Sequence, residues 1–276
     1  MKKIVFLLLC IVFGIQGLCD AAMVLYYNFD EVSGSLAADT AGAGDPAFDG
    51  TLSDGFTFDD QSVTGKFGGA LNMAGDVDID INYDGGIILP GETSAGNNFT
   101  VSLWFKNANA SEGGVIFAYG RSGLRFTIGI GSLNGVPEVR VYSKALNDTN
   151  PDVLIRKQLP LSGIDIEDGQ WHHLAVAVSS TQGNTAADPL IYVDGLCAGG
   201  TATANAWTTD LGVFLGRRVF SSKVYYDGYI DDFAIFNTTL SSQDITDIYT
   251  SALPIPEPAT IALLGFACFI FNRKKV

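Results

Sequence analysis

Cysteine is nearly absent from the central part of this 276-residue sequence. Cys10, Cys19 and Cys268 lie close to the two ends, which leaves Cys197 as the single thiol between positions 23 and 253. One thiol cannot form an internal disulfide, and no cysteine or histidine spacing matches a zinc site. The central part must therefore be held together by its hydrophobic core.

Histidine is equally scarce, because His172 and His173 are the only two in the chain. Adjacent strand residues point to opposite faces of a sheet, so this pair cannot bind one metal ion together. No serine with a matching histidine and acid can be selected from the sequence either. We therefore interpret both histidines as part of the framework and not as the base of a nucleophile.

Basic residues are also few. The chain has 16 lysines and arginines against 30 acidic residues, which gives a formal net charge of -14. Several of the basic residues lie at the two ends, so the segment between positions 23 and 253 is more acidic still. Such a surface repels phosphate backbones and anionic lipids, and we exclude nucleic acid as a partner.

The N-terminus has the pattern of a secretory signal peptide. Lys2 and Lys3 form a positive start, Ile4–Ile15 is an apolar run of suitable length, and small residues around Cys19–Ala22 offer a cleavage site. The sequence thus predicts a signal peptide over residues 1–22 and an exported protein.

The C-terminus combines a Pro-Glu-Pro motif, a short apolar stretch and a basic end, in that order. As a helix, Ala259–Phe271 would rise only about 20 Å, which is short of the roughly 30 Å hydrocarbon core of a bilayer. The combination resembles the PEP-CTERM sorting signal of bacteria that carry an exosortase. The motif residues are Pro256, Glu257 and Pro258, and the basic residues are Arg273, Lys274 and Lys275.

This resemblance implies that residues 254–276 form a transient membrane anchor. The basic cluster would stop transfer and stay on the cytoplasmic side, so the central domain would lie outside. An exosortase-type enzyme would then cut the chain near Pro256. We therefore expect an inner-membrane intermediate, followed by the cell surface or the extracellular matrix. An ordinary tail anchor is the alternative interpretation.

Short alternating runs of apolar and polar residues fill positions 23 to 253, separated by turns rich in Gly, Asn and Asp. In Phe99–Phe105 the odd-numbered residues are all apolar, which predicts a strand with one face on a core. Ser241 and Asp244 form a capping-box pair at the start of one short helix. Many short strands with regular turn signals indicate an all-β sandwich.

Seven segments resemble, in order, the landmarks of LamG-like domains with the concanavalin A-like jelly-roll fold. They are Leu25–Glu31, Ala38–Gly42, Gly65–Leu71, Phe99–Phe105, Asp168–Ala175, Ile191–Gly195 and Gly228–Asn237. The resemblance implies a single domain over residues 23–253. It is expected to be a two-sheet antiparallel jelly-roll sandwich with a short C-terminal helix, followed by the terminal hydrophobic segment.

Ile164-Asp165-Ile166-Glu167 resembles the Glu-x-Asp-x-Glu strand of retaining glucanases with the same jelly roll. In those enzymes two facing carboxylates act as nucleophile and acid/base. Here Gly163 stands in place of the first Glu, and the string lies in a stretch with the character of a turn. We therefore predict no catalytic residues and no enzymatic activity.

Asp231 is the most informative carboxylate. Strand alternation predicts that it shares a face with Phe233, and that Asp232 lies on the other face. A buried ionised aspartate needs hydrogen bonds or a cation. The family resemblance implies a structural calcium ion (Ca2+) where the opening loop meets the closing strand, and the matching carboxylates are those of Asp30, Asp39 and Asp231.

Three tryptophans have rings able to stack on sugars. For Trp104 and Trp171 we prefer packing against the rest of the protein. Trp207 lies in a stretch rich in Gly, Thr and Ala, so we predict that it is the exposed ring and the ligand-binding residue.

Three functions fit these observations. The first is a secreted or envelope-associated, non-catalytic LamG-like module that binds a glycan or an envelope protein in the extracellular matrix. The second is a glycoside hydrolase or lyase on the same fold, and the third is a structural matrix protein without a defined ligand. Fold alone does not choose among them. A cleft with two facing carboxylates would favour the second, and a sheet with exposed aromatic side chains would favour the first.

Overall fold

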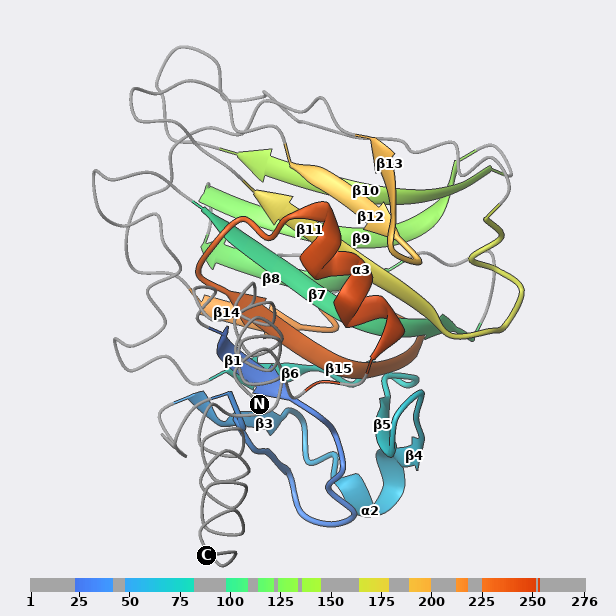
Figure 1. The fold of residues 1–276 in the computed structure, drawn as a ribbon. Helices are drawn as coiled ribbons and strands as arrows, with labels where there is room; N and C mark the ends of the chain where they lie inside the picture. The colour runs from blue at the N-terminus through green and yellow to red at the C-terminus, as the bar shows by residue number, and fades with distance from the viewer. Residues whose placement is uncertain are drawn as a thin grey trace, which may run out of the picture.

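The computed structural model describes residues 23–41, 48–81, 98–108, 114–121, 124–133, 136–144, 164–178, 189–199, 212–217, 225–251 and 253. Within these residues nearly all regular structure is β-strand, arranged as two antiparallel sheets packed face to face (Figure 1). The described helices are α2 (Phe58–Gln61) and α3 (Ser242–Thr250). The predicted two-sheet antiparallel sandwich with a short C-terminal helix is confirmed.

We call the sheet that lies next to α3 sheet A. In the described part of the chain it has eight strands, of which seven follow the order β13-β12-β11-β7-β15-β5-β4, while β1 pairs with β15. The bounds are β1 Met23–Tyr27, β4 Ser62–Thr64, β5 Gly69–Asn72, β7 Phe99–Asn107, β11 His172–Val178, β12 Leu190–Val193, β13 Leu196–Gly199 and β15 Gly228–Phe236.

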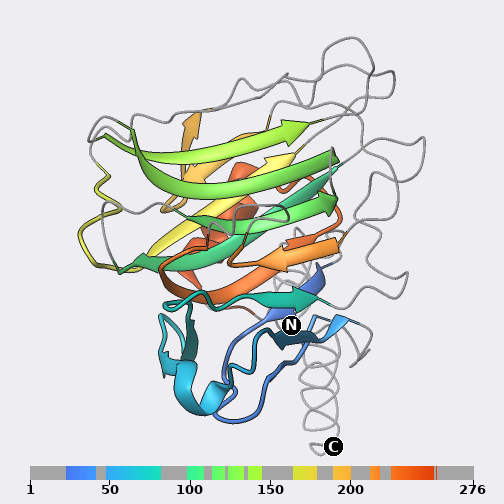
Figure 2. The ribbon, with the colours of Figure 1, turned by 180° about the vertical axis from the view of Figure 1, so that it is seen from behind.

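The second sheet, sheet B, faces the viewer in Figure 2. Its seven described strands follow the order β10-β9-β8-β14-β6-β3-β2. The bounds are β2 Leu36–Ala37, β3 Gly50–Leu52, β6 Ile79–Ile81, β8 Val115–Arg121, β9 Leu124–Leu133, β10 Val136–Lys144 and β14 Gly212–Leu215.

The main core lies between the two sheets. The odd-numbered side chains of Phe99–Phe105 point into it from β7, which confirms the face predicted from their alternation. Sheet B contributes Phe117, Phe126 and Ile128 from the other side. Each such side chain stabilises the fold by about 1.5–3 kcal/mol when fully buried. Cys197, in the edge strand β13, is a free and exposed thiol, so this core holds the domain without it.

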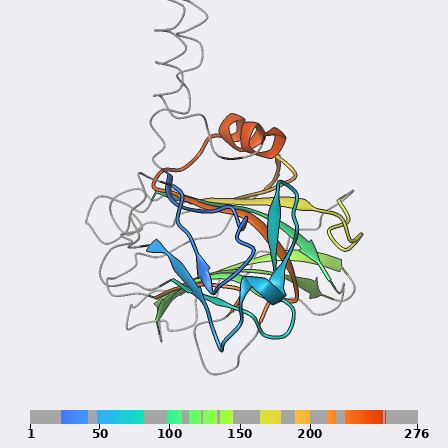
Figure 3. The same ribbon diagram turned by 90° about the horizontal axis from the view of Figure 1, so that it is seen from below.

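A smaller cluster lies on the outer face of sheet A, where α3 packs (Figure 3). The helix begins at the predicted capping box: the Ser241 hydroxyl accepts the Asp244 amide, and the Asp244 carboxylate accepts the Ser241 amide. Ile245 and Ile248 are its buried residues. They join small strand residues that let the helix lie close to the sheet, namely Ala175, Ala177 and Ala234.

Strand β15 carries one extra residue beside its partner β7. Asp231 pairs with Trp104 and Ala234 pairs with Ser102, so three steps along β15 match two along β7. Asp232 accommodates the extra residue with a φ of 49°, in the left-handed region. The predicted alternation is therefore wrong at this point, because Asp231 and Asp232 both lie on the outer face of sheet A, away from the main core.

The described residues contain no helix long and apolar enough to cross a membrane. The segments predicted as signal peptide and sorting signal, residues 1–22 and 254–276, lie outside the described residues. The predictions made for those two segments therefore stay predictions.

Candidate functional site

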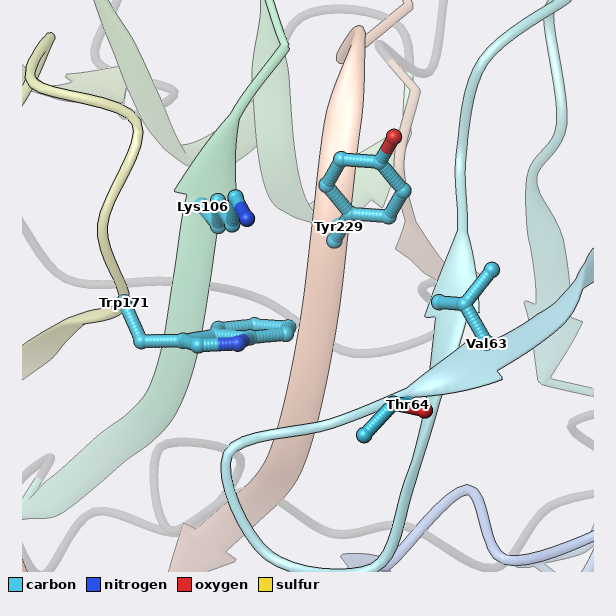
Figure 4. Close-up of a pocket in the computed structure, with 5 residues that line it drawn as sticks. All are labelled: Val63, Thr64, Lys106, Trp171 and Tyr229. Atoms are coloured by element: carbon cyan, nitrogen blue, oxygen red, sulfur yellow. The ribbon is translucent and has the colours of Figure 1, made fainter.

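A pocket of about 230 Å³ opens on the outer face of sheet A. Figure 4 shows its lining side chains arriving from β4, β7, β15 and the segment just before β11. They are Val63, Thr64, Lys106, Trp171 and Tyr229. Lys106 follows Trp104 on the same face of β7, so the pocket continues the surface that α3 covers at its other end.

Strand pairing sets the central side chains of the pocket side by side. Lys106 and Tyr229 are direct partners on β7 and β15, and the Lys106 ammonium lies 5.8 Å from the centre of the Tyr229 ring. The ring centre of Trp171 lies 6.5 Å from that of Tyr229, with an angle of 60° between the planes. The pocket thus combines two angled aromatic rings with one cation.

Trp171 is positioned by the turn that precedes β11. The Asn107 side chain donates to the Ile166 carbonyl oxygen at 2.8 Å and accepts from the Tyr226 hydroxyl at 3.0 Å. Ile166 is itself buried in the main core. The turn is therefore anchored at Ile166, by the hydrogen bond to Asn107 and by burial in the core. This anchoring, and not a free loop, sets the position of Trp171 next to Tyr229.

The β4–β5 hairpin, which supplies Val63 and Thr64, is held by two carboxylates. Oδ2 of Asp231 accepts the backbone amides of Lys66 at 2.7 Å and Phe67 at 3.0 Å. Oδ1 of Asp30 accepts the backbone amide of Gly69, two residues after Phe67, at 2.7 Å. Hydrogen bonds to ionised acceptors are among the strongest in proteins, so these contacts fix one wall of the pocket.

Trp104 lies beneath the turn of the same hairpin. Its ring stacks on Tyr249 of α3 at 5.5 Å and meets the edge of Phe67 at 5.8 Å, while the Lys66 ammonium lies 4.5 Å from its centre. Only 2% of Trp104 is exposed. The packing role predicted for Trp104 is confirmed, whereas Trp171 is half-buried and reaches the pocket.

Asp232 is buried beside the Tyr26 hydroxyl, which lies 2.5 Å from its Oδ1 and 2.8 Å from the Leu253 carbonyl oxygen. One hydroxyl proton can serve only one of these acceptors. Burial raises the pKa of Asp232 to about 6, and a proton on this carboxyl leaves the Tyr26 proton free for Leu253. Burial also raises the pKa of Asp231 to about 7, against the opposing effect of the hairpin amides.

The three residues predicted to bind calcium are not gathered into one ligand set. Asp30 and Asp231 contact the same hairpin turn, whereas Oδ1 of Asp39 accepts the amides of Tyr26 and Ala41. Among the described acidic, histidine and cysteine side chains, no three form a group that could hold a metal ion. As placed, these residues do not fit a shared ion, and calcium binding stays a prediction.

The carboxylates of the glucanase-like string lie in a turn, as expected from the sequence. Asp165 is exposed, and its Oδ1 accepts the Glu167 amide at 3.0 Å. Ile166, between them, is buried. A retaining glycosidase needs two carboxylates facing each other across a cleft, and this pair does not provide them.

The two histidines have separate surroundings, as predicted. His172 lies 3.0 Å from Asp168 and 2.9 Å from Asp194. His173 is fully buried, its Nε2 lies 2.9 Å from the Ser102 hydroxyl, and burial lowers its pKa to about 4. The sequence did not reveal this serine–histidine contact, which depends on the pairing of β7 with β11. Because both groups are buried, we interpret the contact as packing.

Four of the five pocket residues were not indicated by the sequence, namely Val63, Thr64, Lys106 and Tyr229. Alternation places Lys106 on the outer face of its strand, but only the pairing of β7 with β15 puts it next to Tyr229. The predicted ligand residue Trp207 lies outside the described residues, as do the sorting motif at 256–258 and the basic cluster at 273–275.

A laminin G family model, described as the concanavalin A-like lectin/glucanases superfamily, matches residues 82–246. This match confirms the LamG-like resemblance found in the sequence. A search of the curated proteins gave no match.

Several solved structures share the fold. Domain 4 of AbnA, an extracellular GH43 arabinanase from Geobacillus stearothermophilus solved with arabinotriose, has a TM-score of 0.56 and 20% identity, covering 83% of this chain and 98% of that one. The binding domain of botulinum neurotoxin serotype D/C has a TM-score of 0.53 and 14% identity, covering 83% and 52%. A Trypanosoma rangeli sialidase has a TM-score of 0.52 and 13% identity, covering 83% and 32%. At these identities the likeness concerns the fold alone.

The calcium prediction can be tested by thermal melting. If Asp30, Asp39 and Asp231 share an ion, calcium will raise the melting temperature, because a ligand present at a hundredfold excess over its Kd stabilises the folded state by about 2.7 kcal/mol. Asp39→Asn keeps an oxygen for the two amides and should abolish the rise. Magnesium serves as the control for screening of the acidic surface. Identical melting curves with and without millimolar calcium would contradict the prediction.

The buried acid pair predicts an unusual dependence of stability on pH. A carboxyl whose folded pKa is raised stabilises the fold fully below its unfolded value near 4, and this contribution is lost as pH rises through the folded pKa of about 6 for Asp232 and about 7 for Asp231. Asp232→Asn keeps the acceptor for Tyr26 but removes the titration. We expect it to raise stability at pH 8 by on the order of 1–3 kcal/mol, and much less at pH 4.

Urea unfolding at a series of pH values measures this difference. Asp76→Asn is the matched control, because Asp76 is an exposed aspartate that also has a positive φ. A stability difference between the Asp232→Asn variant and the unaltered protein that is the same at pH 4 and pH 8 would contradict the raised pKa.

Proposed function

The chain belongs to the concanavalin A-like lectin/glucanases superfamily, and from this we propose that it is an exported, non-catalytic module that binds glycan through the pocket around Trp171 and Tyr229. The observation that carries the proposal is the meeting of two aromatic rings in a pocket on the outer face of sheet A. The alternatives, a hydrolase or a purely structural protein, have no comparable feature among the described residues.

The chemistry of the pocket suits a sugar ring. The C–H faces of a pyranose or furanose are apolar, so they pack on aromatic rings, while their hydroxyls need a few polar partners. Trp171 and Tyr229 supply the faces, and Thr64 and Lys106 supply polar groups at the rim. Pockets for drug-sized ligands start at roughly 300 Å³, so this smaller one suits a single unit of a longer glycan.

The arabinanase domain supports the same class of ligand. It was solved in complex with arabinotriose, and the alignment covers almost all of that domain. The shared fold does not carry over the binding residues at this identity. It does make arabinotriose a reasonable first probe for a binding experiment.

We extend the proposal to the location of the protein. The predicted signal peptide at residues 1–22 and the predicted sorting segment at residues 254–276 would bring the domain across the inner membrane and hold it there. Processing by an exosortase-type enzyme would then release it to the cell surface or extracellular matrix. In that compartment an extracellular glycan or an envelope protein would be the partner.

Replacing the tryptophan tests the pocket. Trp171→Ala should weaken binding of a glycan found on an array, with arabinotriose included, by tenfold or more, because a central aromatic side chain at a binding site is typically worth 2 kcal/mol or more. Isothermal titration with the purified domain gives the affinities. The same titrations should release no sugar products, since the proposal is binding without turnover.

Trp207→Ala is the matched control for the aromatic residue. Binding that is lost in Trp207→Ala and kept in Trp171→Ala would move the site to the residue predicted from the sequence. Glycan turnover that disappears in Glu167→Gln would overturn the non-catalytic assignment.

The intact mass of the native protein tests the proposed processing. We expect a form that lacks residues 1–22 and ends near Pro256, found outside the inner membrane. The physical reason is that Ala259–Phe271 is shorter than the hydrocarbon core of a bilayer, which disfavours it as a permanent membrane span. A segment that holds the chain only until it is cut does not need the full length. A species that keeps Arg273–Val276 and fractionates with the inner membrane would contradict processing.

A further inference from the structure

The pocket carries one formal charge at neutral pH, and that charge is positive. Of its lining residues only Lys106 is ionised, in a chain whose net charge is -14. An acidic protein surface repels anions in general, so a cation that lines a concave site marks a place where an anion is favoured.

Among the described residues, no carboxylate forms an ion pair with Lys106, and its ammonium lies 5.8 Å from the centre of the Tyr229 ring. Two carboxylates that lie within three residues of the pocket-lining Tyr229 and Trp171 have other partners. Asp231 accepts the hairpin amides, and Asp168 accepts the Gln170 amide and faces His172.

A second cation flanks the same site. Lys66 lies in the turn that follows Thr64, is exposed, and has its ammonium 4.5 Å from the centre of the Trp104 ring. Trp104 and Lys106 are on the same face of β7, so the two ammonium groups belong to one stretch of the outer face of sheet A. A chain of acidic sugars would meet a positive group inside the pocket and another beside it.

We propose that the pocket selects sugars that bear a carboxylate, and that Lys106 is the residue that recognises this negative charge. The proposal rests on the proposed glycan-binding function and names its ligand class. The ring of a uronic acid would pack against Trp171 and Tyr229, and its carboxylate would pair with the Lys106 ammonium. A partly desolvated pair of this kind favours the charged sugar over a neutral one of the same shape.

Tetragalacturonate and its fully methyl-esterified form are the probes, because they differ in charge and share the sugar backbone. Isothermal titration of the full folded domain at low salt should show at least tenfold tighter binding of the acid. This preference should shrink severalfold when the salt concentration is raised to 0.5 M. In Lys106→Met, which keeps the apolar stem over Tyr229, the preference for the acid should fall to less than twofold.

Lys66→Met is the matched control, since Lys66 lies outside the pocket lining. It should keep most of the preference. Equal binding of acid and ester by the unaltered protein, or a preference that survives in Lys106→Met, would overturn the role of Lys106 and leave the glycan-binding proposal standing. Failure of every glycan on the array to bind would overturn the proposed function itself. Circular dichroism of each variant separates loss of binding from loss of fold.

Discussion

The extra residue in β15 is the constraint on which the outer face of sheet A depends. In a regular strand Asp231 and Asp232 would point to opposite faces, and one of them would enter the main core as a charge. The left-handed backbone at Asp232 turns both outward. Asp231 can then bind the turn of the β4–β5 hairpin, and Asp232 can meet Tyr26, whose hydroxyl also reaches Leu253. One irregularity therefore connects the strand β1, a wall of the pocket and Leu253.

Burying two neighbouring carboxylates is costly, and the raised pKa of each one is the measure of that cost. The backbone amides of Lys66 and Phe67 offset part of it. The resulting hairpin has little freedom, because Asp30 holds the next part of the same turn. A binding site whose walls are ordered before the ligand arrives loses less conformational entropy on binding. Two walls of this pocket are held in this way: the β4–β5 hairpin by Asp30 and Asp231, and the turn before Trp171 by Asn107.

The same sandwich occurs in proteins with different activities, among them an arabinanase domain, a toxin binding domain and a sialidase. Function therefore depends on the side chains that a particular chain presents on the scaffold. In this chain the acidic string that resembles a catalytic strand lies in an anchored turn, where its buried Ile166 serves the core and positions Trp171. The aromatic and basic side chains of the proposed site, Trp171, Tyr229 and Lys106, instead meet on the outer face of sheet A.

The sequence by itself determined the class of the fold, the face of β7 that enters the core, the capping box of α3 and the turn around Asp165, because each follows from local periodicity or from hydrogen bonds within a few residues. It also indicated Asp30 and Asp231 as important carboxylates, and in the structure both accept backbone amides of one hairpin turn. Only the tertiary structure decided that Lys106, Tyr229 and Trp171 share a pocket and that Ser102 meets His173. These contacts depend on which strands pair and in what register, and on one extra residue in β15. Pairing between strands far apart in the chain leaves no local pattern in the sequence.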